Sequence, residues 1–191
     1  MNKKKSGAAL FIDILIKVCG MICITSFAIY NTGINNNNIL LWIGVTTFTI
    51  VYHLGLRLVA GNITAKIKHI LKNDAFLFKE RKFESMLYKL LRVKKWKKNA
   101  LTYDPSSFSL KENTKEEVLS TMLKSELDHW INELISLSTL LFGLIWGEMW
   151  IFILTCLAAM IFDAQFICIQ RYNRPRLSKL IDKENIAKKS A

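Results

Sequence analysis

Long apolar stretches dominate the pattern of this chain, and charged residues rarely interrupt them. Four windows consist almost entirely of apolar residues: 8–30, 39–60, 127–146 and 149–169. A helix of roughly 20 apolar residues crosses a hydrocarbon core about 30 Å thick, and each window is close to that length. The pattern therefore predicts an all-α, polytopic membrane protein with four transmembrane helices, forming a single membrane domain over residues 1–191.

Basic residues gather in every second segment outside these windows. The chain has 27 Lys and Arg against 15 Asp and Glu. Fifteen of the basic residues lie within 61–125, seven lie from Arg171 onward, and three are Lys3, Lys4 and Lys5, whereas the links at 31–38 and at 147–148 contain none. Lys and Arg favour cytoplasmic loops. We therefore expect a membrane protein whose two termini, loop 61–126 and tail 170–191 face the cytoplasm.

The first window and the cysteines have simple interpretations. The stretch 8–30 is longer than the apolar region of a signal peptide and precedes no small-x-small cleavage site, so we expect a retained anchor. All four cysteines lie inside apolar windows, where we expect small buried residues rather than disulfides or a zinc site. Charged and apolar residues occupy different stretches of the chain. This separation excludes a disordered chain and disfavours an ordinary soluble enzyme.

The basic loop contains an amphipathic segment and a predicted helix start. Apolar residues recur at helical spacing, and lysines surround the tryptophan that comes next: Phe83, Met86, Leu87, Leu90 and Leu91, then Lys94, Lys95, Trp96, Lys97 and Lys98. Such a segment lies in the headgroup plane. It either contacts anionic lipid alone or also holds an anionic or phosphorylated substrate. A loop is predicted at 99–115, and Thr114 is predicted to begin a helix that continues into the third window.

Ionisable residues cluster at the start of the third window. Glu126, His129 and Glu133 stand at i, i+3 and i+7 and share one helical face. A carboxylate beside an imidazole fixes its tautomer and raises its basicity, which suits a general base acting on a hydroxyl. The alternative is an interfacial histidine with solvated acids. A Glu-x-x-His half-site for metal would need a second copy on another helix, and the sequence contains none, so we expect no metal.

A second polar cluster comes after the fourth window, at Gln170-Arg171-Tyr172-Asn173-Arg174-Pro175-Arg176. Pro175 disfavours a helical conformation at the preceding residue, so we expect the helix to break there. Asp163 and Gln170 are seven residues apart and share a face. Three arginines around one proline suit phosphate or carboxylate binding, although a stop-transfer cluster has the same composition. His53 and Arg57 are expected to be structural or to extend their polar ends toward the membrane interface.

Two of these clusters resemble one known family. Glu126-Leu127-Asp128-His129-Trp130, the string Gln170 to Leu177 and the stretch Val93-Lys94-Lys95-Trp96-Lys97 are similar to motifs of the glycosyl-4,4'-diaponeurosporenoate acyltransferases, over about residues 78–179. These are small bacterial membrane proteins of staphyloxanthin-type carotenoid synthesis. The resemblance departs from the family pattern at Asp163 and Gln165, where the family has Asn and Pro.

The resemblance implies transfer of a fatty acyl group to a hydroxyl of a lipid-linked acceptor, a glycosylated carotenoid, at the cytoplasmic face of a bacterial cell membrane. Our hypothesis makes His129 the general base and Glu126 the residue that orients it. The expected substrate-binding residues are Arg174 and Arg176 for donor phosphates or the oxyanion, Asp163, Gln170 and Asn173 for the acceptor, Trp96 and Lys97 for donor docking, and Tyr172.

The expected partners are membrane lipids, the acceptor lipid and an acyl donor such as acyl-CoA or acyl carrier protein. No bound cofactor and no nucleic acid are expected. The alternative function is a non-enzymatic membrane scaffold or accessory subunit that recruits a partner through its basic loop. A transporter would need more polar residues at mid-membrane and an inverted repeat, and no repeat is visible in the sequence.

Overall fold

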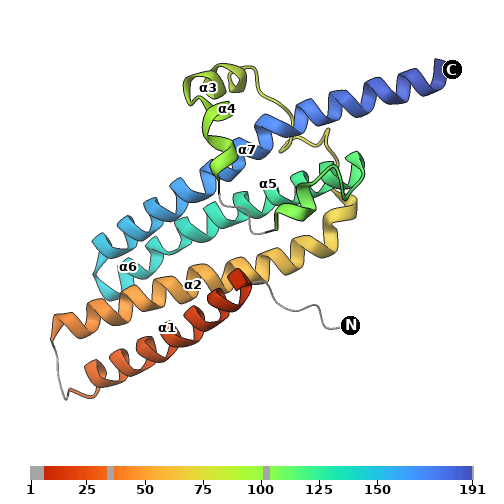
Figure 1. Cartoon of the computed structure of the whole chain (residues 1–191). Coiled ribbons are helices and arrows are strands. Elements are labelled where there is room, and N and C mark those ends of the chain that lie inside the picture. Colours follow the sequence, from red (N-terminus) through yellow and green to blue (C-terminus); the bar gives the residue numbers. More distant parts are fainter. Residues whose placement is uncertain (1–6, 34–36, 101–103, 191) are drawn as a thin grey trace, which may run out of the picture. The chain divides into compact units, whose positions relative to one another are not determined.

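The computed structural model describes residues 7–33, 37–100 and 104–190, and every regular element within these ranges is helical. The long helices are α1 (Gly7–Asn31), α2 (Asn38–Ile67), α5 (Lys115–Ser138) and α7 (Met149–Ser190) (Figure 1). Short helices and 3₁₀ turns connect them: η1 (Lys68–Ile70), α3 (Glu84–Leu90), α4 (Val93–Trp96), η2 (Lys97–Asn99), η3 (Pro105–Phe108) and α6 (Leu140–Trp146). The predicted all-α class is confirmed. Lys3, Lys4 and Lys5 lie outside the described residues.

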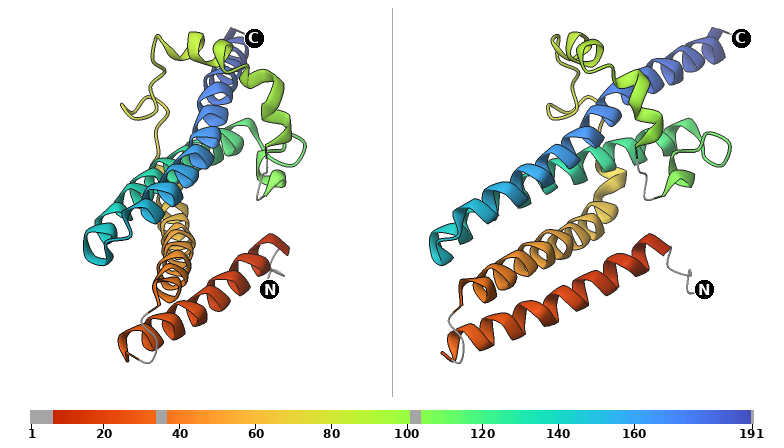
Figure 2. Two further views of the ribbon diagram at one scale, coloured as in Figure 1. Left: turned by 90° about the vertical axis from the view of Figure 1, so that its left-hand side faces the viewer. Right: turned by 60° about the vertical axis from the view of Figure 1, so that its left-hand side comes forward.

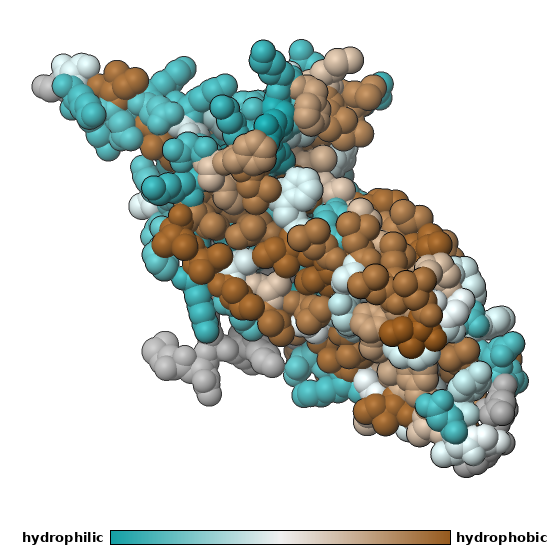
Figure 3. Space-filling view, turned by 180° about the vertical axis from the view of Figure 1, so that it is seen from behind, coloured by the Kyte–Doolittle hydropathy of each residue, from teal (hydrophilic) through white to brown (hydrophobic). Residues whose placement is uncertain are grey.

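Three helical stretches in the described part of the chain are long and apolar enough to cross a membrane: Leu10–Asn31, Asn38–Ile70 and Met149–Ser190. They overlap the first, second and fourth predicted windows, and the last two extend well beyond the predicted ends. Many of their large apolar side chains face outward, including Phe11, Met21 and Ile24. Apolar side chains also cover much of the face seen in Figure 3. Exposed apolar surface of this kind marks contact with lipid or with another protein.

The third predicted window, 127–146, is not one uninterrupted helix. Helix α5 ends at Ser138 and α6 begins at Leu140. At the interruption, the Thr139 hydroxyl donates to the Ser136 carbonyl over 2.6 Å and the Ser138 hydroxyl donates to the Ile135 carbonyl over 2.7 Å. Hydroxyls that bond back to the preceding turn compete with the helical ladder and bend it. The apolar pattern of residues 127–146 does not predict this interruption.

The predicted break at Pro175 is wrong, because α7 continues through it to Ser190 (Figure 2). Proline removes one backbone donor from a helix interior and crowds the preceding turn. Both flanking turns are nevertheless fixed by contacts to other segments. Arg174 forms an ion pair with Glu126, and Leu177 is buried against Val118. These contacts on either side favour continuation of the helix over a surface turn.

The chain forms two compact units, and α2, α5 and α7 contribute to both. The first unit comprises the chain up to Ala60 together with Ile131–Ile161. Its core is formed by Val45, Ile151 and Phe152, with aromatic side chains around them. The ring centroids of Phe48 and Trp146 lie 4.8 Å apart in an edge-to-face arrangement. Gly147 has a φ of 75° and ends α6, which glycine does without steric strain.

The second unit comprises Gly61–Trp130 together with the chain from Phe162 onward. In this unit α5 packs along α7 through Val118, Leu177 and Ile181, with Leu119 and Met122 at the margin. Phe78 before α3, Tyr88 within α3 and Val93 within α4 are buried. The predicted amphipathic stripe is helical over Glu84–Leu90, and Phe83, Met86, Leu90 and Leu91 are exposed.

The predicted helix start at Thr114 is confirmed, and its atoms form a reciprocal cap. The backbone N–H of Thr114 donates to Glu117 Oε2 over 2.8 Å, and the N–H of Glu117 donates to the Thr114 hydroxyl over 3.2 Å. This is the capping-box arrangement. It satisfies two backbone donors at the start of α5, which carries His129.

Thr114→Ala should lower the free energy of unfolding by about 1 kcal/mol, because the cap hydroxyl is lost. Thr114→Ser keeps a hydroxyl and should stay near the wild-type value. Chemical unfolding of the purified protein in micelles measures both. Equal stability of the alanine and serine variants would show that the cap contributes nothing.

Candidate functional site

His129 of α5 and Asp163 of α7 form a hydrogen-bonded pair in the second unit. The His129 Nδ1 atom lies 2.8 Å from Asp163 Oδ1. The Asp163 side chain is 1% exposed, whereas the His129 side chain is 18% exposed. The imidazole also stacks on Phe166, with ring centroids 4.7 Å apart and planes 9° apart. Asp163 therefore fixes the ring at Nδ1 and Phe166 covers one of its faces, while part of the ring remains accessible.

This geometry determines which nitrogen of His129 can accept a proton. When the Asp163 carboxylate is ionised it only accepts hydrogen bonds, and Nδ1 then carries the hydrogen of this pair. The lone pair is then on Nε2, the nitrogen that a general base needs. A carboxylate in this position also stabilises the imidazolium that forms when the base takes up a proton.

Glu126 occupies a different environment from the one its spacing predicted. Its carboxylate is fully buried, with Oε1 2.5 Å from Arg171 Nη1 and Oε2 3.0 Å from Arg174 Nε. Two guanidinium groups therefore neutralise a carboxylate that is closed off from solvent. The prediction that Glu126 orients His129 is wrong. The structure gives that place to Asp163, because the two arginines on α7 hold Glu126 instead.

The two arginines extend this cluster to the segment before α3. Arg171 donates to Glu84 and to the carbonyls of Leu77 and Lys79, the latter two over 2.8 and 2.9 Å. Arg174 donates to the Asn73 side chain and to the Phe78 carbonyl. We call Glu84, Glu126, Arg171 and Arg174 the buried ion-pair network. It joins three remote parts of the chain: the segment 73–84, α5 and α7.

Glu84 completes the network on the side of α3. Tyr88 donates its phenolic hydrogen to Glu84 Oε2 over 2.6 Å. Burial raises the pKa of the Glu84 carboxyl, but the hydrogen bonds from Arg171 and Tyr88 lower it more, and the balance lies below the usual value. Burial and the hydrogen bond to Glu84 both raise the pKa of Tyr88. Glu84 therefore stays ionised and Tyr88 stays protonated around neutral pH.

A separate group of cations surrounds Tyr172 on the same helix. Lys97 Nζ donates to Asn173 Oδ1 over 2.6 Å and lies 4.6 Å from the centre of the Tyr172 ring. The Arg176 guanidinium carbon lies 3.6 Å from the centre of that ring. Arg176 is exposed, and Lys97, Tyr172 and Asn173 are half-buried. We call these four residues the Tyr172 cation cluster.

Comparison with known protein families gives a match in this part of the chain. The family model of glycosyl-4,4'-diaponeurosporenoate acyltransferase matches residues 74–183. The chain belongs to this family. The matched range includes the buried network, the His129–Asp163 pair and the Tyr172 cation cluster, and the family name indicates an acyltransferase. No curated protein and no solved structure matches the chain.

Not all predicted site residues of this family member are positioned as expected. Arg174 was expected to hold donor phosphates, but it is 2% exposed and its nitrogens donate to Glu126, Asn73 and the Phe78 carbonyl. It is therefore closed to a soluble donor in this structure, and its predicted role toward donor phosphates or the oxyanion stays a prediction. Arg176, by contrast, is exposed. Trp96 donates its indole hydrogen to the Leu91 carbonyl over 2.9 Å, which joins α4 to the end of α3.

Gln170 and Asp163 both lie in the second unit and are both buried. Gln170 Nε2 donates to the Ser125 hydroxyl over 3.2 Å. Gln170 therefore contacts the turn of α5 that precedes Glu126, and Asp163 contacts the turn that carries His129. Glu133, which shares a helical face with His129 in sequence, belongs to the first unit.

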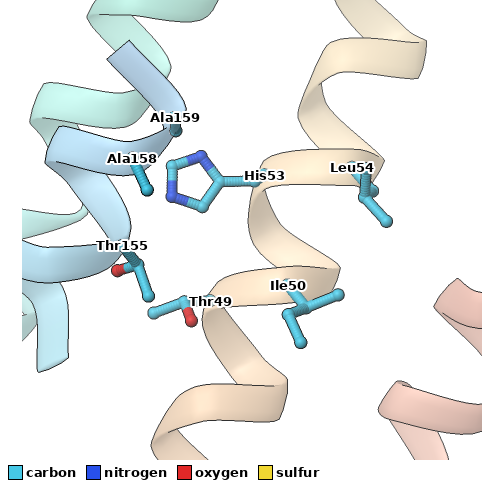
Figure 4. Close-up of a pocket in the computed structure, with 7 residues that line it drawn as sticks. All are labelled: Thr49, Ile50, His53, Leu54, Thr155, Ala158 and Ala159. Atoms are coloured by element: carbon cyan, nitrogen blue, oxygen red, sulfur yellow. The ribbon is translucent and has the colours of Figure 1, made fainter. Parts of the chain in front are cut away.

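His53 lies in the first unit and lines an apolar pocket. Its imidazole extends from α2 toward the first part of α7, between the pocket residues shown in Figure 4: Thr49, Ile50, Leu54, Thr155, Ala158 and Ala159. No group of three or more His, Cys, Asp or Glu side chains that could hold a metal ion is found in the part of the chain that the structure describes.

Three residues of the site were not predicted from the sequence: Asn73, Glu84 and Phe166. Glu84 was detectable in principle, because it is an acidic residue inside a strongly basic stretch and lies four residues before Tyr88. Asn73 and Phe166 carry no comparable signal. Their roles depend on which remote segments pack against α5 and α7, and local spacing does not specify that packing.

Glu126→Gln should destabilise the protein by about 3 kcal/mol or more, because removing one partner of a buried ion pair leaves buried cations uncompensated. Thermal unfolding in micelles, followed by tryptophan fluorescence, measures the effect. The matched control Glu112→Gln removes an exposed carboxylate and should change stability by less than about 0.5 kcal/mol. Similar unfolding curves for the two variants would contradict a stabilising role of the network.

Proposed function

We propose that the protein is an integral membrane acyltransferase that moves a fatty acyl group from a thioester donor to a hydroxyl of a glycosylated, carotenoid-like lipid. Family membership supports the acyl transfer and the carotenoid-type acceptor. The three long apolar helices support residence in the membrane. The last part of α5 together with α6 is the fourth crossing in this proposal.

Basic charge determines the proposed orientation in the membrane. The loop between α2 and α5 and the end of α7 hold most of the lysines and arginines, and such segments stay in the cytoplasm. Both termini are then cytoplasmic and the His129–Asp163 pair is reached from the cytoplasmic side. The acceptor glycan and the donor would both approach from that side.

The proposed chemistry uses His129 as the general base. The acceptor hydroxyl attacks the thioester carbonyl while its proton passes to Nε2 of His129. An O–C bond forms, the C–S bond breaks, and the thiolate leaves with the proton that the imidazolium returns. The products are the acyl ester and a free thiol, and no other reactant is required. General-base assistance of this kind contributes roughly 10²–10⁴-fold to a rate.

Asp163 is the positioning residue in this mechanism. Its buried carboxylate holds Nδ1–H of His129 and stabilises the imidazolium between the two proton transfers. The observation that carries the proposal is this pair, in which a fully buried carboxylate lies 2.8 Å from a partly exposed imidazole. The buried ion-pair network has a different role, because it fixes the turns of α5 and α7 on which the pair lies.

His129→Ala should lower acyl transfer at least 100-fold, because the base is lost. Asp163→Asn should lower it less, because an amide oxygen still accepts from Nδ1–H but carries no charge. Whole-lipid mass spectrometry of cells lacking the protein, and of cells restored with each form at equal protein level, measures the transfer. The matched control is His69→Ala, which removes an exposed histidine of the same unit.

Loss of one acylated lipid with His129→Ala but not with His69→Ala would support the mechanism and identify the acceptor. Near wild-type transfer by His129→Ala would overturn it. The scaffold alternative makes the opposite prediction, since it expects His129→Ala to be silent and charge reversal at Lys94, Lys95, Lys97 and Lys98 to abolish the phenotype. The two functions are therefore separated by the same set of strains.

A further inference from the structure

The Tyr172 cation cluster differs electrostatically from the buried ion-pair network on the same helix. Within the network, Arg171 and Arg174 are neutralised by Glu84 and Glu126. In the described part of the chain, no ion pair joins Lys97 or Arg176 to a carboxylate. The cluster therefore carries a positive charge that the protein does not compensate.

Neighbouring lysines add to the positive charge of the Tyr172 cation cluster. Burial lowers the pKa of the Lys97 ammonium, and the nearby charges of Arg176, Lys98 and Lys94 lower it further. These cations repel one another, and the folded chain still holds them together through Asn173 and the Tyr172 ring. An anion bound between them would relieve the repulsion. Arginine and lysine together are the side chains that bind phosphate most effectively.

The position of the cluster along α7 indicates which phosphate it would bind. Asp163 and Asn173 are ten residues apart on one helix, which corresponds to a rise of about 15 Å. The reacting thioester lies at His129 and Asp163 in the proposed mechanism. An extended pantetheine arm separates a thioester from its phosphate by a distance of this order, whereas the phosphate of a lipid headgroup has no such link to the reaction.

We propose that the Tyr172 cation cluster binds the phosphate at the end of the pantetheine arm, so that the acyl donor is a 4'-phosphopantetheine thioester. This inference rests on the proposed acyl transfer. The Arg176 guanidinium, whose Nη1 donates to the Tyr172 carbonyl, donates to the phosphate through its remaining N–H groups. The Lys97 ammonium donates to another phosphate oxygen while Asn173 keeps it in place. Coenzyme A and acyl carrier protein both present this group, and the experiment distinguishes them.

The test compares donors that share one thioester arm and differ only in the group attached to its far end. Purified protein in neutral micelles is given the same fatty acyl group on pantetheine, on 4'-phosphopantetheine, on coenzyme A and on acyl carrier protein. We expect the phosphorylated donors to have a KM at least about tenfold lower than acyl-pantetheine, the value for one charge-assisted hydrogen bond. A lower KM for coenzyme A or for the carrier protein identifies the source of the phosphate.

Two variants connect this preference to the cluster. Lys97→Gln and Arg176→Gln should each raise the KM of the phosphorylated donors about tenfold and leave the KM of acyl-pantetheine unchanged. Lys179→Gln removes an exposed cation one turn further along α7 and should change neither value. The proposal is overturned if the two variants weaken all donors equally, or if wild-type protein does not distinguish phosphorylated from unphosphorylated donors.

A direct binding measurement separates failure of the site from failure of the proposed function. Calorimetric titration with unacylated coenzyme A needs no reaction, and His129→Ala should bind it as the wild type does. Binding that is lost in Lys97→Gln and Arg176→Gln supports the phosphate site even where no transfer occurs, and only the proposed function then fails. If these variants respond to added phosphatidylglycerol but not to donor phosphate, the cluster is a lipid headgroup site and the proposal is overturned.

Discussion

The neutralisation of Glu126 is the interaction on which the second unit depends. A carboxylate without solvent contact is stable only when cations and hydrogen-bond donors surround it, and here Arg171 and Arg174 supply both. The same arginines hold Glu84 and backbone carbonyls of residues 77–79. The register of α5 against α7 and the position of the segment before α3 therefore result from one electrostatic requirement. This requirement also explains why α7 continues through Pro175.

The fold class was predictable from the sequence, because apolar windows, basic loops and the Thr114 cap are local signals. The arrangement of the site was only partly predictable. Helical spacing placed Glu126 and His129 on one face, but it could not decide which of them would bind the arginines, since Arg171 is 45 residues away from Glu126. For the same reason, the effect of Pro175 was misjudged. Local propensity predicts a break there, and contacts with remote segments override it.

Arg174 and Arg176 have different environments in the structure, although their positions in the sequence predict a shared role. Arg174 and Arg176 were grouped because they flank one proline, yet they differ by two positions on a helix and point in different directions. Arg174 is buried in the network, and Arg176 lies on the Tyr172 ring at the surface. An interval of two residues on a helix corresponds to a rotation of about 200°. Neighbouring residues of the same type can therefore belong to different environments, one structural and one available to a ligand.

Three groups of charged side chains lie along α7: the buried ion-pair network, the His129–Asp163 pair and the Tyr172 cation cluster. They differ in net charge, and this difference supports a catalytic interpretation of His129. The buried network pairs two carboxylates with two guanidiniums and is balanced without any contribution from Asp163. The His129–Asp163 pair is therefore not needed to neutralise the network. A general base requires this independence, because its charge changes during every turnover while its position must not.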